Sequence, residues 1–218
     1  MTEPAYLADT RVAYDIVAAN YAELLETELA GKPLDRAMLA TFAELTAADD
    51  GGPVADIGCG PGRVTAHLRS LGVTAFGIDL SPGMIEEARR RYPGLRFEVG
   101  SMTGLDLSDG ELAGIVAWYS IIHTPPESLP VVFAEFHRTL APGAHLLLAF
   151  QAGNERRRIE QGYGHRVSLD AYRLAPDRIA EQLCQAGIVV TARLLREPTE
   201  QEKTPQAYLL AHKPRTVS

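Results

Sequence analysis

The stretch "VADIGCGPGRVTAHL", residues 54–68, sets three glycines at alternate positions between an apolar run and a helical pattern. The run before the glycines is typical of a buried strand, and the apolar residues after them recur at a helical spacing. Glycines in such a loop let a ligand touch the backbone, and the following helix aims its free N–H groups at the same place. The stretch therefore predicts a strand–loop–helix unit that binds a nucleotide-like molecule.

Strands and helices alternate through the rest of the chain. Further strands are expected at residues 74–79, 96–100, 113–122 and 144–151, with helices at 82–92, 129–140 and 176–186. Helical connections of this length imply right-handed crossovers and a mostly parallel sheet covered on both faces. Two closing strands, 188–196 and 206–213, have no helix between them, so they should form a hairpin that places one antiparallel strand in the sheet.

The N-terminal part has a different pattern. Helices are expected over residues 10–29 and 34–45, and the segment "TAADDGG", 46–52, marks a boundary. We therefore expect a helical cap over residues 1–50 and a binding domain over residues 51–218. The cap and the connection at residues 151–173 should close over the site and exclude water.

Composition and charge limit the classes of partner. The chain has 218 residues, 46% of them hydrophobic, which is ordinary for a globular protein, and its formal net charge is −7. An acidic balance argues against nucleic acid as the main partner, because phosphate binding needs a basic footprint. The basic clusters at residues 89–91 and 156–158 are expected on solvated surfaces.

The cysteines and the apolar runs bear on location. Cys59 and Cys184 lie far apart and belong to no Cys/His cluster, which predicts neither a disulfide framework nor a metal site. No apolar run approaches the roughly 20 residues that span a bilayer, and the polar start resembles no signal peptide. We expect a cytoplasmic protein that does not bind membranes, and the sequence predicts no oligomeric state.

An acidic residue ends the strand that follows the glycine loop. Ligands of open parallel sheets bind beyond the carboxyl ends of the strands, where a carboxylate such as Asp79 can accept both hydroxyls of a ribose. The dinucleotide fingerprint G-x-G-x-x-G is not matched, because Arg63 occupies the position of its third glycine. Asp56 instead precedes the glycines, in the pattern D-x-G-x-G-x-G. Together these features predict an adenosine-type ligand.

At these residues, and in the later segments "GIDLS" and "RTLAPGAHLLLAF", the sequence resembles the class I S-adenosylmethionine-dependent methyltransferases, particularly the small-molecule group. The resemblance extends roughly from Tyr14 to the C-terminus. It implies an α/β fold with a Rossmann-like, doubly wound, seven-stranded sheet of order 3-2-1-4-5-7-6, strand 7 being antiparallel, and an N-terminal helical lid. The fourth strand departs from the pattern, since "AGIVAWYS" is apolar where many relatives begin with Asp.

The resemblance also implies the cofactor, S-adenosylmethionine, and the residues that hold it. Asp56 and the backbone of Gly58 and Gly60 would hold the charged methionine end, with Cys59 in the same loop. Asp79 would bind the ribose. The other implied cofactor contacts lie along the adenine, near the sulfonium or on the lid, and they are Leu80, Ser101, Met102, Tyr119, Tyr14 and Tyr21.

Two histidines are candidates for catalysis. His123 follows the fourth strand, whose carboxyl end is where substrate and methyl donor should meet, so it could accept a proton from a substrate hydroxyl or amine. The alternative is that His123 is only a turn residue before "TPP". His165, in "GYGHR", is the second candidate, as a base or as part of the substrate pocket. No metal ligand is predicted.

The expected function is methylation of an oxygen or nitrogen atom of a small molecule, by in-line transfer that yields S-adenosylhomocysteine. Two alternatives stay open. An NAD(P)-dependent oxidoreductase shares the crevice and the ribose-binding acid, although the glycine spacing counts against it. A non-catalytic S-adenosylmethionine-binding protein would have the same cofactor motifs.

Overall fold

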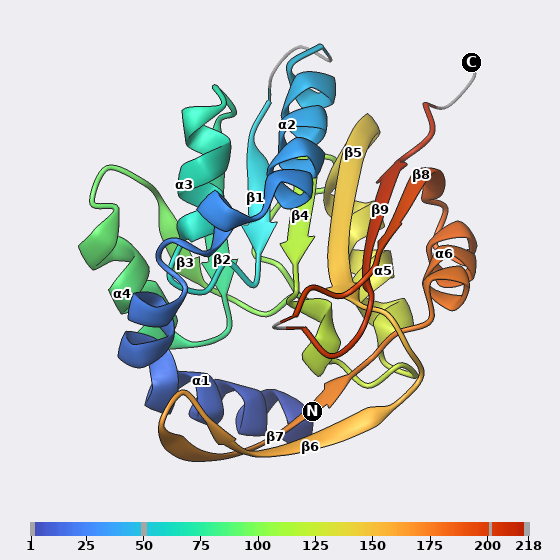
Figure 1. Ribbon diagram of the computed structural model, residues 1–218. Helices are drawn as coiled ribbons and strands as arrows, with labels where there is room; N and C mark the ends of the chain where they lie inside the picture. The colour runs from blue at the N-terminus through green and yellow to red at the C-terminus, as the bar shows by residue number, and fades with distance from the viewer. Residues whose placement is uncertain (1–2, 49–51, 201, 216–218) are drawn as a thin grey trace.

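The computed structural model describes residues 3–48, 52–200 and 202–215, and a twisted sheet lies at its centre (Figure 1). The seven strands of this sheet have the order β3-β2-β1-β4-β5-β9-β8. Their bounds are β1 Val54–Ile57, β2 Ala75–Asp79, β3 Phe97–Val99, β4 Leu112–Trp118, β5 Leu140–Gln151, β8 Val189–Arg196 and β9 Gln206–His212. The five strands β1 to β5 are parallel, and β9 is antiparallel to both β5 and β8. The predicted order is confirmed, because β8 and β9 are the sixth and seventh strands of the sheet.

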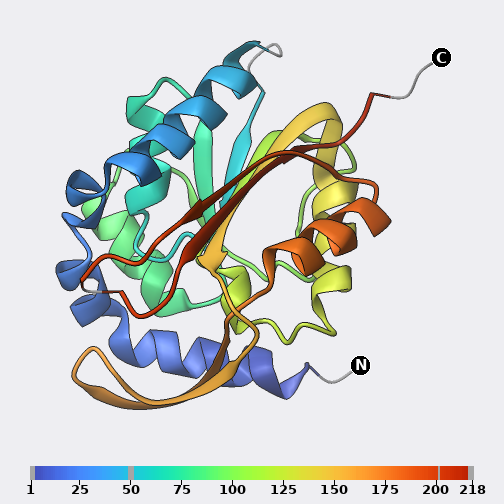
Figure 2. The same cartoon turned by 45° about the vertical axis from the view of Figure 1, so that its right-hand side comes forward.

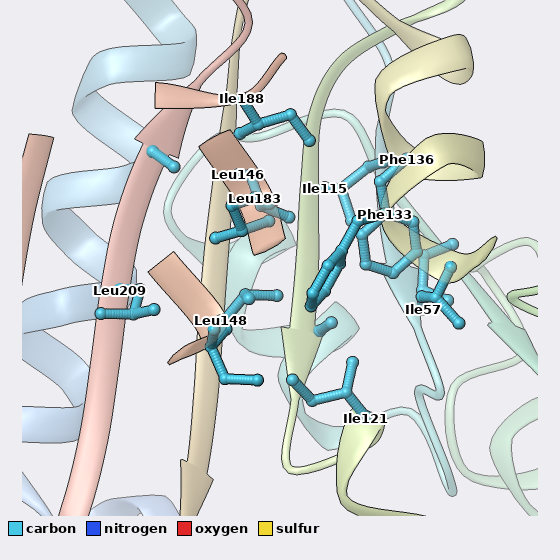
Figure 3. Packing of buried hydrophobic residues seen from close by; sticks show 14 of the residues in the cluster. Ile57, Ile115, Ile121, Phe133, Phe136, Leu146, Leu148, Leu183, Ile188 and Leu209 are labelled. Carbon is cyan, nitrogen blue, oxygen red and sulfur yellow. The ribbon is translucent and has the colours of Figure 1, made fainter. Parts of the chain in front are cut away.

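Helices cover both faces of the sheet (Figure 2). Their bounds are α1 Ala5–Leu24, α2 Pro33–Ala48, α3 Arg63–Ser70, α4 Pro82–Arg91, α5 Leu129–Thr139 and α6 Pro176–Gln185. Buried side chains of α2 and α3 form one cluster with the sheet, whereas those of α5 and α6 form another. Figure 3 shows the second cluster, in which Phe133 and Phe136 of α5 pack beside Ile115 of β4. The sheet is thus fixed between two apolar layers, and only the ends of its strands are left for a site.

Helix α1 and a separate hairpin lie across the carboxyl ends of the parallel strands (Figures 1 and 2). The hairpin consists of β6 Arg156–Gly162 and β7 His165–Tyr172, and α1 packs against β7 and α4. Its two turn residues are Tyr163 and Gly164, with φ of 52° and 84°. Positive φ at both positions matches the twist of paired strands. The sequence predicted only a connection at residues 151–173, with no strands in it; tyrosine seldom takes the first position of such a turn.

The ends of several predicted elements differ from the structure. The helix predicted at 10–29 runs from Ala5 to Leu24 and is followed by a 3-10 turn at Glu28–Gly31. The strand predicted at 113–122 ends at Trp118, because Tyr119 adopts a left-handed backbone conformation, and Ile121–His123 forms a 3-10 turn. The predicted boundary between residues 50 and 51 lies outside the described residues. Within the predicted cap, α1 covers the strand ends, whereas α2 packs against the sheet.

Candidate functional site

A cavity opens at the carboxyl ends of the central strands, beneath α1. It holds about 700 Å³ of space that atoms do not fill, part of it open to solvent. We call this cavity the cofactor crevice. Its lining includes the predicted residues Tyr14, Tyr21, Gly58, Gly60, Asp79, Leu80, Ser101, Met102, Tyr119 and His123. Most of the predicted site residues therefore meet in one place.

The glycines bring backbone to the surface of this crevice. A Cβ atom built on Gly58 would lie 2.2 Å from Cβ of Ser120, and the φ of Gly58 is +75°. The Ser120 hydroxyl donates a hydrogen bond to the carbonyl of Ile57 at 2.7 Å, so the ends of β1 and β4 meet without room for another side chain. At Gly60, with φ of +54°, the nearest atom to such a Cβ is in Tyr21 at 3.7 Å. A ligand can therefore approach the backbone at Gly60.

Asp79 is held at the edge of the crevice by two backbone donors. The N–H of Gly60 donates to Oδ2 at 2.8 Å, and the N–H of Ser81 donates to Oδ1 at 2.9 Å. Burial raises the pKa of Asp79 to about 6, while these backbone hydrogen bonds act in the opposite direction. Each carboxylate oxygen can accept a second hydrogen bond. The arrangement fits a carboxylate that receives the two hydroxyls of a ribose.

Asp56 and Cys59 lie outside the lining of the crevice. Oδ2 of Asp56 accepts a hydrogen bond from the Thr65 hydroxyl at 2.6 Å, and Oδ1 is buried without a hydrogen-bond partner. Burial raises the pKa of Asp56 to about 7 and that of the Cys59 thiol well above its usual value. Asp56 therefore ties the strand before the glycines to helix α3, and Cys59 stays a protonated thiol at neutral pH.

Strained backbone marks the end of β4. Tyr119 has a φ of 55°, which costs a residue with a side chain about 1–3 kcal/mol. Its N–H donates to the carbonyl of Ala149 at 2.8 Å, and its hydroxyl lies 3.3 Å from that of Tyr208. The Tyr208 hydroxyl donates in turn to the buried carboxylate of Asp35 at 2.7 Å. These contacts fix Tyr119 in a conformation that directs the chain into the crevice.

His123 is the best connected of the candidate catalytic residues. Its Nδ1 lies 2.8 Å from the carbonyl oxygen of Asp170, and its Nε2 lies 2.7 Å from the hydroxyl of Tyr14. A carbonyl only accepts, so Nδ1 carries the proton and the neutral ring presents Nε2 as an acceptor to Tyr14. Burial lowers the pKa of His123 and raises that of Tyr14 well above its usual value. At neutral pH, then, Tyr14 donates a hydrogen bond to an uncharged His123.

The second histidine lies elsewhere. His165 begins β7 and lines a separate hollow at the tip of the hairpin, with Tyr163 and Gly164, rather than the cofactor crevice. The structure therefore does not bring His165 and His123 to one site. Tyr163 instead contacts the lid, because its ring packs edge-on against that of Tyr21 with centroids 4.8 Å apart.

Sequence reasoning missed part of the lining. The residues not predicted include Tyr6, Leu7, Thr10, Ile57, Gly100 and Thr124. A signal for Tyr6 and Thr10 was present, because Tyr6, Thr10 and Tyr14 recur at intervals of four and share one face of a helix. Starting the predicted helix at Thr10 hid the turn that carries Tyr6 and Leu7.

A second cavity adjoins the first, between α1 and the hairpin. It shares Tyr14 and His123 with the cofactor crevice and holds about 600 Å³ of unfilled space, part of it open to solvent. We call it the hairpin cavity. The rest of its lining is Ala13, Val17, Ile122, Gln151, Arg157, Ile159, Gly162, Tyr163, Val167, Leu169 and Ala171. The arrangement provides two adjoining spaces with one histidine between them.

Comparison with known proteins finds similarity in the central part of this fold. A family model described as "Methyltransferase domain" matches residues 54–143. A demethylmenaquinone methyltransferase of Beutenbergia cavernae is 28% identical over 141 residues, which are 65% of this chain and 57% of the relative. A trans-aconitate 2-methyltransferase of Methylobacterium nodulans is 47% identical over 55 residues, which are 24% of this chain and 21% of the relative. The chain thus spans between a fifth and three fifths of the lengths of these two relatives.

A solved structure extends the likeness to nearly the whole chain. Magnesium protoporphyrin IX methyltransferase from Synechocystis, crystallised with bound S-adenosylmethionine, superposes with a TM-score of 0.71 at 17% identity, and the match covers 98% of this chain and 99% of that one. The predicted resemblance to class I methyltransferases, whose methyl donor is S-adenosylmethionine, is confirmed by the family model and by these relatives. The donor set fits this molecule, since Asp79 can take a ribose and the backbone at Gly60 is open to a ligand.

In the described part of the chain, no helix has both the length and the apolar character needed to cross a bilayer. Nor do three or more His, Cys, Asp or Glu side chains gather there in an arrangement that could hold a metal ion.

Proposed function

Because residues 54–143 form a methyltransferase domain, we propose that this chain transfers the methyl group of S-adenosylmethionine to an oxygen or nitrogen atom of a small molecule. The observation that carries the proposal is the adjacency of the two cavities, with Tyr14 and His123 in the lining of both. A cofactor in one cavity and an acceptor in the other would meet at these side chains. The hairpin cavity, which would hold the acceptor, lies between α1 and the hairpin, and this enclosed position favours a small molecule over a macromolecule.

Different residues of the crevice suit the ribose, the adenine and the methionine end of the cofactor. Asp79 would accept the ribose hydroxyls, and Leu80 and Met102 offer apolar surface to the adenine. The backbone at Gly58 and Gly60 would face the methionine end. When bound, S-adenosylmethionine supplies a methyl group that its sulfonium has already activated. The chain therefore needs mainly to hold the acceptor atom in line, which can contribute on the order of 7–11 kcal/mol to lowering the barrier.

The proton of the acceptor has a path into the protein. The neutral Nε2 of His123 is a proton acceptor that already holds the hydroxyl of Tyr14, and both side chains line the two cavities. As the acceptor atom gains its methyl group, its proton would pass to the oxygen of Tyr14 while Tyr14 gives its own to His123. The carbonyl of Asp170 stabilises the imidazolium that forms, because it already accepts a hydrogen bond from Nδ1.

The proposal is tested by following a labelled methyl group. The protein would be incubated with methyl-tritiated S-adenosylmethionine and, separately, with the small-molecule, protein and nucleic-acid fractions of a cell extract. We expect label to enter the small-molecule fraction, and Asp79→Asn to abolish the transfer. Asp106→Asn, at an exposed position outside both cavities, is the matched control and should leave it unchanged. Label in the protein or nucleic-acid fraction alone would contradict a small-molecule acceptor, and no transfer at all would favour a non-catalytic binding protein.

A further inference from the structure

The two faces of the hairpin differ in charge. Arg157 pairs with Ala171, and Ile159 pairs with Leu169 across the two strands. Residues opposite each other in antiparallel strands project to the same face. Leu169 and Ala171 are buried, so Arg157 lies on the face that the hairpin turns toward the protein. The sequence grouped this arginine with its two neighbours on a solvated surface, and the structure separates it from them.

The neighbouring arginines already have an anionic partner. Arg156 and Arg158 lie on the other face of the hairpin, and both form ion pairs with the carboxylate of Asp170, at 2.8 and 3.4 Å. The guanidinium of Arg157 has no hydrogen bond or ion pair with any residue in the described part of the chain. Arg157 is an exposed residue, and it lines the hairpin cavity.

Apart from Arg157, the hairpin cavity has four polar side chains in its lining, those of Tyr14, His123, Gln151 and Tyr163. Among its described lining residues, none is acidic, and Arg157 is the permanent charge. His123, which also lines the cavity, is neutral in the state described above. Most of the remaining lining is aliphatic: Ala13, Val17, Ile122, Ile159, Val167, Leu169 and Ala171. A guanidinium beside a mostly aliphatic lining suits a ligand that has an apolar body and one anionic group, because two parallel N–H donors match a carboxylate.

We infer that the methyl acceptor is an apolar molecule with a carboxylate, and that Arg157 binds this carboxylate while the apolar body fills the hairpin cavity. This inference rests on the proposed function, because it names the acceptor class of the same site. The carboxylate is an anchor and is not the atom that is methylated. The reacting hydroxyl or amine lies at the other end of the molecule, beside Tyr14 and His123, where the two cavities meet.

The carboxylate could come from another source, the methionine part of the cofactor. The two sources are distinguished by measuring acceptor-site binding and cofactor-site binding separately. Phenylacetate, 3-phenylpropionate and 4-phenylbutyrate are suitable probes, each compared with its primary amide, which has almost the same shape and no charge. Titration calorimetry would be done with the protein free and saturated with S-adenosylhomocysteine.

We expect at least one carboxylate of the series to bind about tenfold more tightly than its amide, as for a hydrogen bond to a charged group. Arg157→Gln should abolish this preference and leave the affinity for S-adenosylhomocysteine unchanged. Arg158→Gln is the matched control, on the same strand and the opposite face, and should retain the preference.

Three results would overturn the inference: amides that bind as tightly as their carboxylates throughout the series, a preference that survives in Arg157→Gln, or a loss of S-adenosylhomocysteine affinity in that variant. The last result would assign Arg157 to the cofactor. Failure of the wild-type protein to bind S-adenosylhomocysteine is a separate result. It would contradict the proposed function, while the carboxylate preference of the free protein would still be measurable.

Discussion

The hydroxyl of Tyr14 lies 2.7 Å from Nε2 of His123, and this contact joins the first helix to the turn after β4. The other ring nitrogen of His123 reaches the backbone of Asp170 in the hairpin. Three segments that are far apart in the sequence therefore meet at one imidazole, between the two cavities. The lid and the proton acceptor form one structural unit, so changes to the lid should affect the chemistry.

The first prediction concerns proton transfer. His123→Gln keeps a polar side chain but removes the basic nitrogen, so turnover should fall by about 10²–10⁴-fold while S-adenosylhomocysteine affinity stays the same. The wild-type rate should fall with decreasing pH only below the usual histidine range, because burial lowers the pKa of His123. Single-turnover rates with the labelled acceptor, measured across a pH series, check both. A loss smaller than tenfold would mean that positioning alone accounts for the rate.

Tyr14→Phe tests whether the hydroxyl of Tyr14 carries the proton to His123. The variant keeps the aromatic ring, which packs edge-on against those of Tyr21 and His123, and removes only the hydroxyl. We expect turnover to fall by about 10²-fold or more with little change in cofactor affinity, because the proton path is broken. The same single-turnover assay measures it. If turnover is unchanged, His123 takes the proton directly and the hydroxyl of Tyr14 has no role in the transfer.

The affinity for the cofactor product should depend on the protonation of Asp79. Its pKa is raised to about 6, and only the carboxylate form accepts both ribose hydroxyls fully. S-adenosylhomocysteine should therefore bind about tenfold more weakly for each pH unit below 6. Calorimetry across this range tests the dependence, and Asp79→Asn should bind weakly at every pH. An affinity that stays constant down to about pH 5 would contradict the ribose assignment.

The buried carboxyl of Asp56 should make the folded protein less stable as the pH rises. Its pKa is about 7 in the folded protein and 3.8 when unperturbed, so the folded state holds its proton more tightly. The stability that results is fully present below about pH 4 and is lost as the pH rises toward 7. Asp56→Asn has no such proton to lose, so its free energy of unfolding relative to that of the wild type should increase as the pH is raised from about 5 to about 8. Urea unfolding at both pH values measures this, and an unchanged difference between the two proteins would refute it.

Gly58 is predicted to tolerate no side chain. In Gly58→Ala the new methyl group would overlap Ser120, and the residue would keep a positive φ. Overpacking and backbone strain each cost about 1–3 kcal/mol, so we expect a destabilisation of about 3 kcal/mol. Gly94→Ala is the matched control, because a Cβ atom there would meet nothing within 4 Å. Comparable free energies of unfolding for the two variants would show that the ends of β1 and β4 do not meet as described.

The sheet and the cofactor crevice could be predicted because their signals are local. The glycine loop, Asp79 at a strand end and the alternation of strands and helices fix which residues reach one end of a parallel sheet. His123 was placed correctly near the crevice for the same reason, since it follows β4 directly. The interpretation of Asp56 was less specific, because spacing does not show whether a strand-end side chain faces a ligand or the helix behind it.

The hairpin could not be predicted. For the same reason, the sequence did not show which side chains of residues 151–173 face the protein. Its turn has tyrosine at a position with positive φ, where asparagine or glycine would have given the signal. Without the strands, Arg157 could not be separated from Arg156 and Arg158, nor His165 assigned to the hairpin tip. Side-chain direction alternates along a strand, so a shift of one residue exchanges the inner and outer faces.

The most direct test of the whole account is a pair of calorimetric titrations of the wild-type protein, one with S-adenosylhomocysteine and one with NADH. A crevice with Asp79 at the ribose position and Arg63 in place of the third glycine predicts tight binding of S-adenosylhomocysteine and none of NADH. Tight binding of NADH without binding of S-adenosylhomocysteine would contradict it and would identify the crevice as a dinucleotide site.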